Sequence, residues 1–250
     1  SDLGALEALA LSGSGEWVAL SLGTRILVLD PTGSVALDEL LPDSALDLAL
    51  DDEGLRLVVG LRGELRLYER APGTGWSLAA LHPGGADEVP TRVALSRDGS
   101  SYGASWWRVQ GPDRLRHELY RSEGHQRCNH LVQEGQPGGP QNAPVGIAFS
   151  ADGQRAVVLL ADDAMGTSQV LGLDLGEDGR TLTAGAASPL DHPAGGMALN
   201  PRSTRLFTTD PLGDRMDLFA LPQDGVLGLP LQQVTTGVQP EAVLVRRGLE

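Results

Sequence analysis

The 250-residue sequence contains no lysine, because all 19 of its basic residues are arginine. Schiff-base and other lysine amine chemistry is therefore excluded. Cys128 is the single cysteine, so no disulfide forms within the chain, and cysteine usage does not indicate a compartment. No apolar run approaches the ~18 residues that a membrane-spanning helix needs, so we expect no direct membrane insertion.

Positive charge is also scarce. The 19 arginines stand against 33 acidic residues, which gives a formal net charge of −14. Such a surface repels phosphate backbones and anionic lipids, so nucleic acid is not an expected partner. The absence of lysine, together with few isoleucines and asparagines, is interpreted as the bias of a GC-rich, bacterial genome.

One seven-residue phrase recurs along the chain. It consists of an apolar residue, usually alanine, a second apolar residue, Ser, Asp or Asn, two variable positions and usually glycine. The central residues of successive copies are 39 to 54 positions apart. The copies are Leu9–Gly15, Leu48–Gly54, Val93–Gly99, Ile147–Gly153, Met197–Ser203 and a degenerate sixth, Ala242–Gly248.

The phrase has a direct physical interpretation. Its alternating residues predict a short buried strand, in which alanine fits a crowded centre. The polar fourth residue caps a tight turn, and glycine adopts the positive φ that the turn requires. After each phrase, further short strands are expected, such as Trp17–Leu20, Ile26–Leu29 and the more polar Trp76–Leu81. No stretch keeps a helical periodicity for more than two turns.

Four strands in each period of roughly 40–50 residues predict an all-β fold, a β-propeller with five complete four-stranded blades plus the first strand of a sixth. A β-sandwich is the alternative, but it would not begin every fourth strand with one phrase. The chain is expected to form a single domain. Its repeats are approximately residues 3–42, 43–86, 87–140, 141–190, 191–236 and, in part, 237–250.

The incomplete sixth repeat favours a six-position ring, or a fragment of a larger propeller, over a closed ring of five blades. An open ring leaves strand edges exposed. We therefore expect a partner chain or a missing segment to complete the sixth blade.

The segments Val145–Gly153 and Gly195–Pro201 resemble the "G-I-A-F-S-P-D-G" repeats of the YVTN/lactonase-like (WD40-like) β-propeller superfamily. The resemblance covers essentially the whole chain and implies a propeller, but these repeats serve both enzymes and scaffolds. The third strands end in pairs such as Leu29-Asp30 and Tyr68-Glu69 rather than Trp-Asp. The YVTN/lactonase-like branch therefore fits better than WD40 proper.

In such a topology, the connections from second to third strands and from fourth strands to the next blade emerge at one end of the ring. The expected loops there are 82–91, 109–114, 133–145, 161–168, 188–196 and 210–215. Loops on a rigid scaffold commonly carry binding residues, so polar residues in these loops are candidates for a binding face. The alternative interpretation is that they are ordinary solvated surface charges. The candidate residues are Asp87, Glu88, Trp107, Arg108, Asp113, Arg114, Asp162, Asp163, Asp191, His192, Asp210, Asp214 and Arg215.

Two narrower patterns are weighed. His125, Cys128 and His130 have the residue types of a zinc site, but three ligands beside an outer strand favour a polar surface loop instead. Trp106 and Trp107 are adjacent in a strand and so point to opposite faces, where packing between blades is favoured for both over an exposed contact.

The sequence contains no G-x-S-x-G elbow and no P-loop. The favoured function is a non-catalytic binding or scaffold module that engages a protein or peptide through its loop-rich face, with no cofactor. The alternative is a lactonase-like hydrolase with a carboxylate, histidine and arginine site at the channel mouth. That alternative allows a divalent metal.

Overall fold

The computed structural model of the chain describes residues 5–85, 87–108, 114–128, 131–134, 142–162, 166–176, 178, 180–222, 227–237 and 240. Side chains are not described for Arg114, Asn142, Asp162 and residues 131–134. Apart from one 3₁₀ turn, η1 (Glu123–His125), every regular element in this part of the chain is a strand. The turn is far too short to cross a membrane.

The strands form five four-stranded antiparallel sheets, as the repeat predicts. Blade 1 contains β1 (Leu6–Leu11), β2 (Val18–Leu22), β3 (Arg25–Leu29) and β4 (Val35–Leu40). Blade 2 contains β5 (Ala45–Leu50), β6 (Arg56–Leu61), β7 (Glu64–Ala71) and β8 (Gly75–Pro83). Blade 3 contains β9 (Glu88–Leu95), β10 (Ser101–Arg108), β11 (Arg114–Arg121) and β12 (Leu131–Glu134). Blade 4 contains β13 (Asn142–Phe149), β14 (Arg155–Asp162), β15 (Thr167–Leu175) and β16 (Leu182–Leu190). Blade 5 contains β17 (Gly196–Leu199), β18 (Arg205–Asp210), β19 (Arg215–Ala220) and β20 (Gln232–Thr235).

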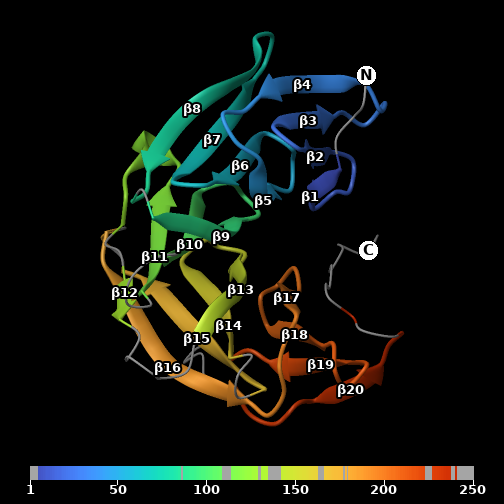
Figure 1. Cartoon of the computed structure of the whole chain (residues 1–250), viewed down its shortest axis with the longest axis vertical. Coiled ribbons are helices and arrows are strands. Elements are labelled where there is room, and N and C mark those ends of the chain that lie inside the picture. Colours follow the sequence, from blue (N-terminus) through green and yellow to red (C-terminus); the bar gives the residue numbers. More distant parts are fainter. Residues whose placement is uncertain are drawn as a thin grey trace.

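The blades follow one another around an arc, with the first strand of each blade toward the centre (Figure 1). Each of these inner strands packs on the next, from β1 on β5 through to β13 on β17. Within the described residues, no comparable packing joins β17 back to β1. The architecture is a β-propeller whose described blades leave the ring open between blade 5 and blade 1.

The turns that end the five described phrases have the predicted chemistry. The Ser12 hydroxyl accepts a hydrogen bond from the Trp17 backbone at 3.0 Å, and Asn200 Oδ1 accepts one from the Thr204 backbone at 2.8 Å. The glycine of the first four copies has a positive φ, from 63° to 72°. In the fifth copy, Ser203 adopts φ 53° without the freedom of glycine, and its hydroxyl accepts a bond from Ala151 N at 2.7 Å.

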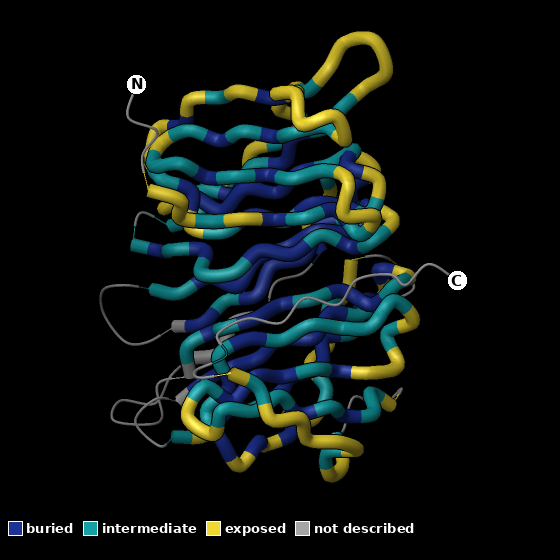
Figure 2. The backbone as a smooth tube through the Cα atoms, turned by 90° about the vertical axis from the view of Figure 1, so that its right-hand side faces the viewer, coloured by how far each residue is buried: buried dark blue, intermediate teal, exposed yellow. Residues whose placement is uncertain are grey.

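The hydrophobic core lies between neighbouring blades. Ile26 and Val28 of blade 1 pack in one cluster with Leu57 and Val59 of blade 2, and all four are fully buried. Figure 2 shows the buried backbone inside the stack of sheets and the exposed segments at turns and outer strands. Each fully buried aliphatic side chain of this kind contributes about 1.5–3 kcal/mol to stability, so the interfaces between blades hold the arc together.

The strands extend further into the loop-rich end than the sequence suggested. The expected loop 82–91 shortens to residues 84–87, because β8 continues to Pro83 and β9 begins at Glu88. Glu88, Asp210 and Arg215 therefore lie at strand ends rather than in loops. In β9, a register shift opposite Ser105 and Trp106 marks a β-bulge, which lets the strand continue despite its irregularity. In blade 5, the regular pairing of β18 with β19 extends to Asp210 and Arg215.

Candidate functional site

The loop-rich end carries the turns between second and third strands and the connections from each fourth strand to the next blade. The structure divides the described candidates there into two groups. Asp87, Glu88 and Arg108 lie where blade 2 meets blade 3, whereas Asp191, His192, Asp210 and Arg215 lie at the start of blade 5.

In the first group, Asp87 pairs with Arg108 at 3.1 Å. Glu88 belongs to an ion-pair system that we call the blade 3 network: Glu88, Arg116, Glu118, Tyr120 and Arg127. The Arg116 guanidinium donates to Glu88 Oε2 at 2.5 Å and also pairs with Glu118. Glu118 is 1% exposed and accepts further bonds from the Tyr120 hydroxyl at 2.8 Å and from Arg127 at 3.2 Å. The buried carboxylate is thus fully paired.

Aromatic rings surround this network. Arg116 lies over the ring of Trp106 at 5.0 Å, and Tyr120 stacks on the imidazole of His82 with ring centroids 3.9 Å apart. His82 Nε2 is also 2.7 Å from the Tyr102 hydroxyl. Burial, reinforced by His125 and Arg127, lowers the pKa of His82 to about 4. The imidazole is therefore neutral at physiological pH, and the arrangement fixes blade 3 against blade 2.

The second group forms what we call the blade 5 cluster: Asp191, His192, Asp210, Arg215 and Asp217. His192 Nδ1 is 2.9 Å from Asp191 Oδ1 and 3.6 Å from Asp217 Oδ2. Arg215 Nε is 3.3 Å from Asp210 Oδ2 and 3.5 Å from Asp217 Oδ2. The hydrogen bond from His192, with the nearby charges of His192 and Arg215, lowers the pKa of the Asp191 carboxyl.

The blade 5 cluster contains buried polar atoms that the described residues leave unpaired. His192 Nε2, Asp217 Oδ1 and Thr208 Oγ1 have no hydrogen-bond partner among them. Thr208 lies directly opposite Asp217 in the β18–β19 register, on the side of the sheet that faces blade 4. Unpaired buried polar atoms of this kind are satisfied in proteins by ordered water or by a ligand.

Several candidates lie elsewhere. Trp106 is fully buried between blades 2 and 3, and Trp107 packs half-buried on the core of blades 3 and 4, as strand alternation predicts. Asp214 lies in the β18–β19 turn with φ 50°. Arg114 and Asp162 lie in β11 and β14, with side chains outside the description, and Asp113 and Asp163 lie outside the described residues altogether.

Of the weak zinc candidate His125, Cys128 and His130, the structure describes the first two residues. Cys128 is fully buried in the core of blades 3 and 4, where burial raises the pKa of its thiol. His125 lies in η1, and His130 is outside the described residues. Among these residues, no three His, Cys, Asp or Glu side chains are grouped to hold a metal ion.

Arg116, Glu118 and Asp217 were not among the candidates predicted from the sequence, because those candidates were polar residues in or beside expected loops. All three lie inside strands. Alternation within β19 places Asp217 on the same face as the buried Phe219, and a charge at a position expected to be apolar is the signal that identifies it.

Further cavities lie away from this end. A central cavity of about 400 Å³ is lined by the apolar residues and alanines of the five phrases. It also includes Asp47, whose pKa burial raises to about 6 and whose carboxylate accepts from the backbone N–H of Val93. The inner strands of the five repeats therefore line one shared central cavity, which carries both apolar and polar groups.

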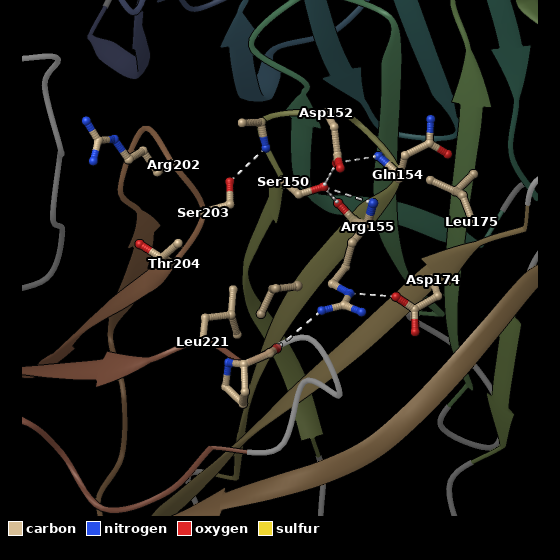
Figure 3. Close-up of a pocket in the computed structure, with 13 residues that line it drawn as sticks. Ser150, Asp152, Gln154, Arg155, Asp174, Leu175, Arg202, Ser203, Thr204 and Leu221 are labelled. Atoms are coloured by element: carbon tan, nitrogen blue, oxygen red, sulfur yellow. Dashed lines mark hydrogen bonds and ion pairs between the residues drawn. The ribbon is translucent and has the colours of Figure 1, made fainter.

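A groove of about 650 Å³ lies at the opposite end, between blades 4 and 5 (Figure 3). The Arg155 guanidinium donates to Asp174 Oδ1 at 2.5 Å and to the Pro222 carbonyl at 3.3 Å. Ser150 donates to Asp152 at 2.6 Å in the adjoining turn. These groups pair with one another through hydrogen bonds, so we interpret the groove as a structural contact between blades 4 and 5.

No family model and no curated relative matches the sequence. Solved structures do match. The periplasmic gluconolactonase PpgL of Pseudomonas aeruginosa is 18% identical with TM-score 0.64, over 92% of this chain and 70% of its own. The Cps50 (Swd1) β-propeller domain of Myceliophteria thermophila is 12% identical with TM-score 0.61, over 93% and 72%. A functionally unknown protein of Desulfotomaculum acetoxidans DSM 771 is 16% identical with TM-score 0.70, over 90% and 67%. The class of the protein is therefore β-propeller. At these identities the likeness defines the fold alone.

Proposed function

We propose that the chain is a non-catalytic binding module that engages a protein or peptide through its loop-rich end. The main observation that supports this proposal is the structure of the β18–β19 turn. Asp210 Oδ1 accepts from the backbone N–H groups of Leu212 at 3.1 Å and Gly213 at 2.8 Å, so the turn is held rigidly. Leu212 at its tip is 76% exposed. A fixed turn that presents an exposed leucine is suited to contact rather than to chemistry.

The charge of the same region favours a basic partner. The side chain of Asp191 is 90% exposed while its carboxylate is held by His192 and Arg215. The chain as a whole carries a net charge of −14. Opposite charge on the partner accelerates encounter and fixes its orientation. We therefore expect a partner with arginine or lysine beside an apolar side chain that contacts Leu212.

Site-specific crosslinking tests this proposal. A photo-reactive amino acid replaces Leu212, and a matched variant carries it at the exposed Thr204, in the turn at the opposite end of the same blade. The proposal expects crosslinks to a discrete partner from position 212 and none from position 204, and loss of capture in Asp191→Arg. Equal crosslinking from both ends contradicts it.

A hydrolase is the second candidate, and the blade 5 cluster is the observation that favours it. The unpaired His192 Nε2 and Asp217 Oδ1 provide a proton acceptor and a carboxylate beside the Arg215 guanidinium. In this function His192 would act as general base and Arg215 would stabilise developing negative charge. No step is assigned to a metal, because the described residues do not group its ligands.

A gluconolactone-hydrolysis assay with and without added divalent metal separates the two functions. The neighbour PpgL is a gluconolactonase, so its lactone class is the appropriate first probe. The binding function expects no turnover above the uncatalysed rate. Turnover that is lost in His192→Gln and retained in the matched Arg205→Gln variant, at the exposed opposite end of blade 5, supports the hydrolase instead.

A further inference from the structure

The third strands of blades 3 and 5 carry one pattern on the face that packs on the preceding blade: an arginine, a carboxylate and an aromatic ring at alternate positions. The strand registers place the aromatic rings, Tyr120 and Phe219, level with the second apolar residue of the phrase in each blade. The two patterns are therefore structurally equivalent. Their members are Arg116, Glu118 and Tyr120 in β11, and Arg215, Asp217 and Phe219 in β19.

Blade 3 provides its buried carboxylate with three donors. Glu118 accepts from Arg116 of its own strand and from the Tyr120 hydroxyl at 2.8 Å. The third donor is Arg127, 3.2 Å away, which lies after η1 and outside the four strands of the blade. Its side chain is 53% exposed, whereas that of Glu118 is 1% exposed. A guanidinium at the surface therefore reaches a carboxylate inside the blade.

Blade 5 lacks two of these three donors. Phe219 occupies the place of Tyr120 but has no hydroxyl. Among the described residues, no second arginine lies within ion-pair distance of Asp217. One oxygen of this carboxylate, Asp217 Oδ1, has no hydrogen-bond partner among them, although the side chain is only 1% exposed. The equivalent carboxylate is thus paired in blade 3 and incompletely paired in blade 5.

The second strand of blade 5 differs from those of the other four blades at the same level. Thr208 lies opposite Asp217, and its buried Oγ1 has no partner among the described residues. Asp210, also buried, lies opposite Arg215. An unpaired buried hydroxyl destabilises a fold unless water or a ligand pairs with it. The equivalent residues are apolar throughout blades 1 to 4: Leu20 and Leu22, Val59 and Leu61, Ala104 and Trp106, and Val158 and Leu160.

The charges of the two blades also differ. In blade 3, the carboxylates of Glu88 and Glu118 pair with two arginines. In blade 5, the single guanidinium of Arg215 serves three carboxylates: Asp191, Asp210 and Asp217. Even a protonated His192 leaves the carboxylates in excess. What blade 5 lacks is therefore a positively charged group with several N–H donors, and a guanidinium has both properties.

We propose that the blade 5 cluster binds the guanidinium of an arginine side chain of the partner, in the role that Arg127 has in blade 3. Its N–H groups donate to Asp217 Oδ1 and Thr208 Oγ1, and the exposed Asp191 pairs with it at the surface. Arg215 turns outward to admit it, since its side chain is 30% exposed and its contacts with the three carboxylates are 3.3–3.6 Å long. This inference rests on the proposed binding function and specifies arginine as the basic residue of the partner.

Supplying the missing hydroxyl from within the chain tests this inference. Phe219→Tyr places a donor beside Asp217, as Tyr120 does in blade 3. The matched Phe207→Tyr adds the same hydroxyl on the opposite face of blade 5. The probe is acetyl-leucyl-arginine amide, titrated into the chain and followed by NMR. We expect it to bind the natural chain and Phe207→Tyr equally, and to bind Phe219→Tyr about 10-fold more weakly, the scale of one hydrogen bond to a charged group.

Thr208→Val is the second variant, because valine is the residue at this position in blades 2 and 4. Removing the unpaired buried hydroxyl should raise the urea midpoint of unfolding. The arginine peptide should nevertheless bind more weakly, since one of its two acceptors is lost. A purely structural role of Thr208 would change the midpoint without changing the affinity for the peptide.

Counterpart peptides with lysine or citrulline in place of arginine complete the test. Citrulline keeps the shape of the arginine side chain without its charge, and lysine keeps the charge without the planar fork of donors. Three outcomes overturn the inference: no binding of the arginine peptide, equal binding of either counterpart, or arginine-peptide binding that neither variant weakens.

The inference and the proposed function fail separately. A discrete partner crosslinked at position 212, together with peptide binding that neither Phe219→Tyr nor Thr208→Val changes, removes only the arginine site. Peptide binding that is weakened in these variants, with no crosslinked partner, supports the arginine site and contradicts the proposed protein partner.

Discussion

The blade 3 network and the blade 5 cluster use the same residue types at the same end of the propeller, with different completeness. In the blade 3 network, the buried Glu118 has three partners, and Arg116 bridges two carboxylates while lying over Trp106. In the blade 5 cluster, the buried Asp217 shares Arg215 and His192 with other carboxylates, and one of its oxygens has no partner among the described residues.

The difference in hydrogen-bonding completeness indicates which of the two clusters has a structural role. A buried charge is retained without loss of stability only when its hydrogen-bonding capacity is filled. In the blade 3 network, the Glu118 carboxylate meets this condition from within the chain, whereas Arg116 Nε has no partner among the described residues. The blade 5 cluster keeps donors and acceptors available, and it lies beside the exposed Asp191 and Leu212. Perturbing the first should therefore change mainly stability, and perturbing the second mainly recognition.

The largest effect is expected for Arg116→Met. It leaves Glu88 without its guanidinium and takes one of three partners from the buried Glu118. The free energy of unfolding should fall by about 3 kcal/mol, the scale for breaking a buried ion pair. Urea denaturation followed by tryptophan fluorescence measures it. The matched control is Arg25→Met, whose exposed pair with Asp38 should be dispensable. Equal losses in the two variants would contradict a structural role for the network.

A smaller loss of stability is expected for Asp217→Asn. The amide keeps the shape of the side chain, and Arg215 retains Asp210 and Asp191 as partners. The free energy of unfolding should fall by about 1–2 kcal/mol, the scale for weakened hydrogen bonds to a charged group. The same denaturation assay gives the value. A loss as large as that of Arg116→Met would show that the two clusters are equally structural.

The stability of the folded chain is expected to depend on pH through His82, which stacks on Tyr120 of the blade 3 network. Its pKa of about 4 in the folded chain is below the usual 6.5, so the unfolded chain binds the extra proton more readily. The stabilisation from neutral His82 is complete above pH 6.5 and is lost as the pH falls toward 4. His82→Phe keeps the stack on Tyr120 and removes the titration. Its urea midpoint should fall less than that of the natural chain between pH 6.5 and 4; parallel curves contradict the assignment.

The smallest effect on stability is expected for Asp191→Ala. The carboxylate is 90% exposed, and exposed ion pairs contribute little, so the free energy of unfolding should change by less than about 0.5 kcal/mol. Capture of a basic partner should nevertheless weaken, which calorimetric titration with the crosslinked partner measures. A stability loss comparable to that of Asp217→Asn would mean that Asp191 is part of the structural core of the cluster.

The sequence predicted much of the fold because the phrase carries local chemistry. Its polar fourth residue and its glycine act within six residues of each other, so Ser12, Asn200 and Gly15 could be assigned without knowing their neighbours. The candidate end was also predicted, since topology alone brings those connections together. The division into two clusters was not. Arg116, Glu118 and Asp217 gain their roles from partners on the same face of their own strands and in other segments of the chain, which no local pattern specifies. The β-bulge in β9 also leaves no clear mark in the sequence.

The sequence alone predicted a β-propeller with five complete four-stranded blades, because a repeated alternation and its turn specify each blade locally, and the described residues form these five sheets. The predicted first strand of a sixth blade, Ala242–Gly248, lies outside the described residues. Which apolar faces of the blades are buried depends on the tertiary structure. Leu9 and Leu48 occupy the same place in the phrase, yet one is exposed and the other buried. The physical reason is that burial depends on the adjacent blade, and blade 1 has no preceding blade among the described residues.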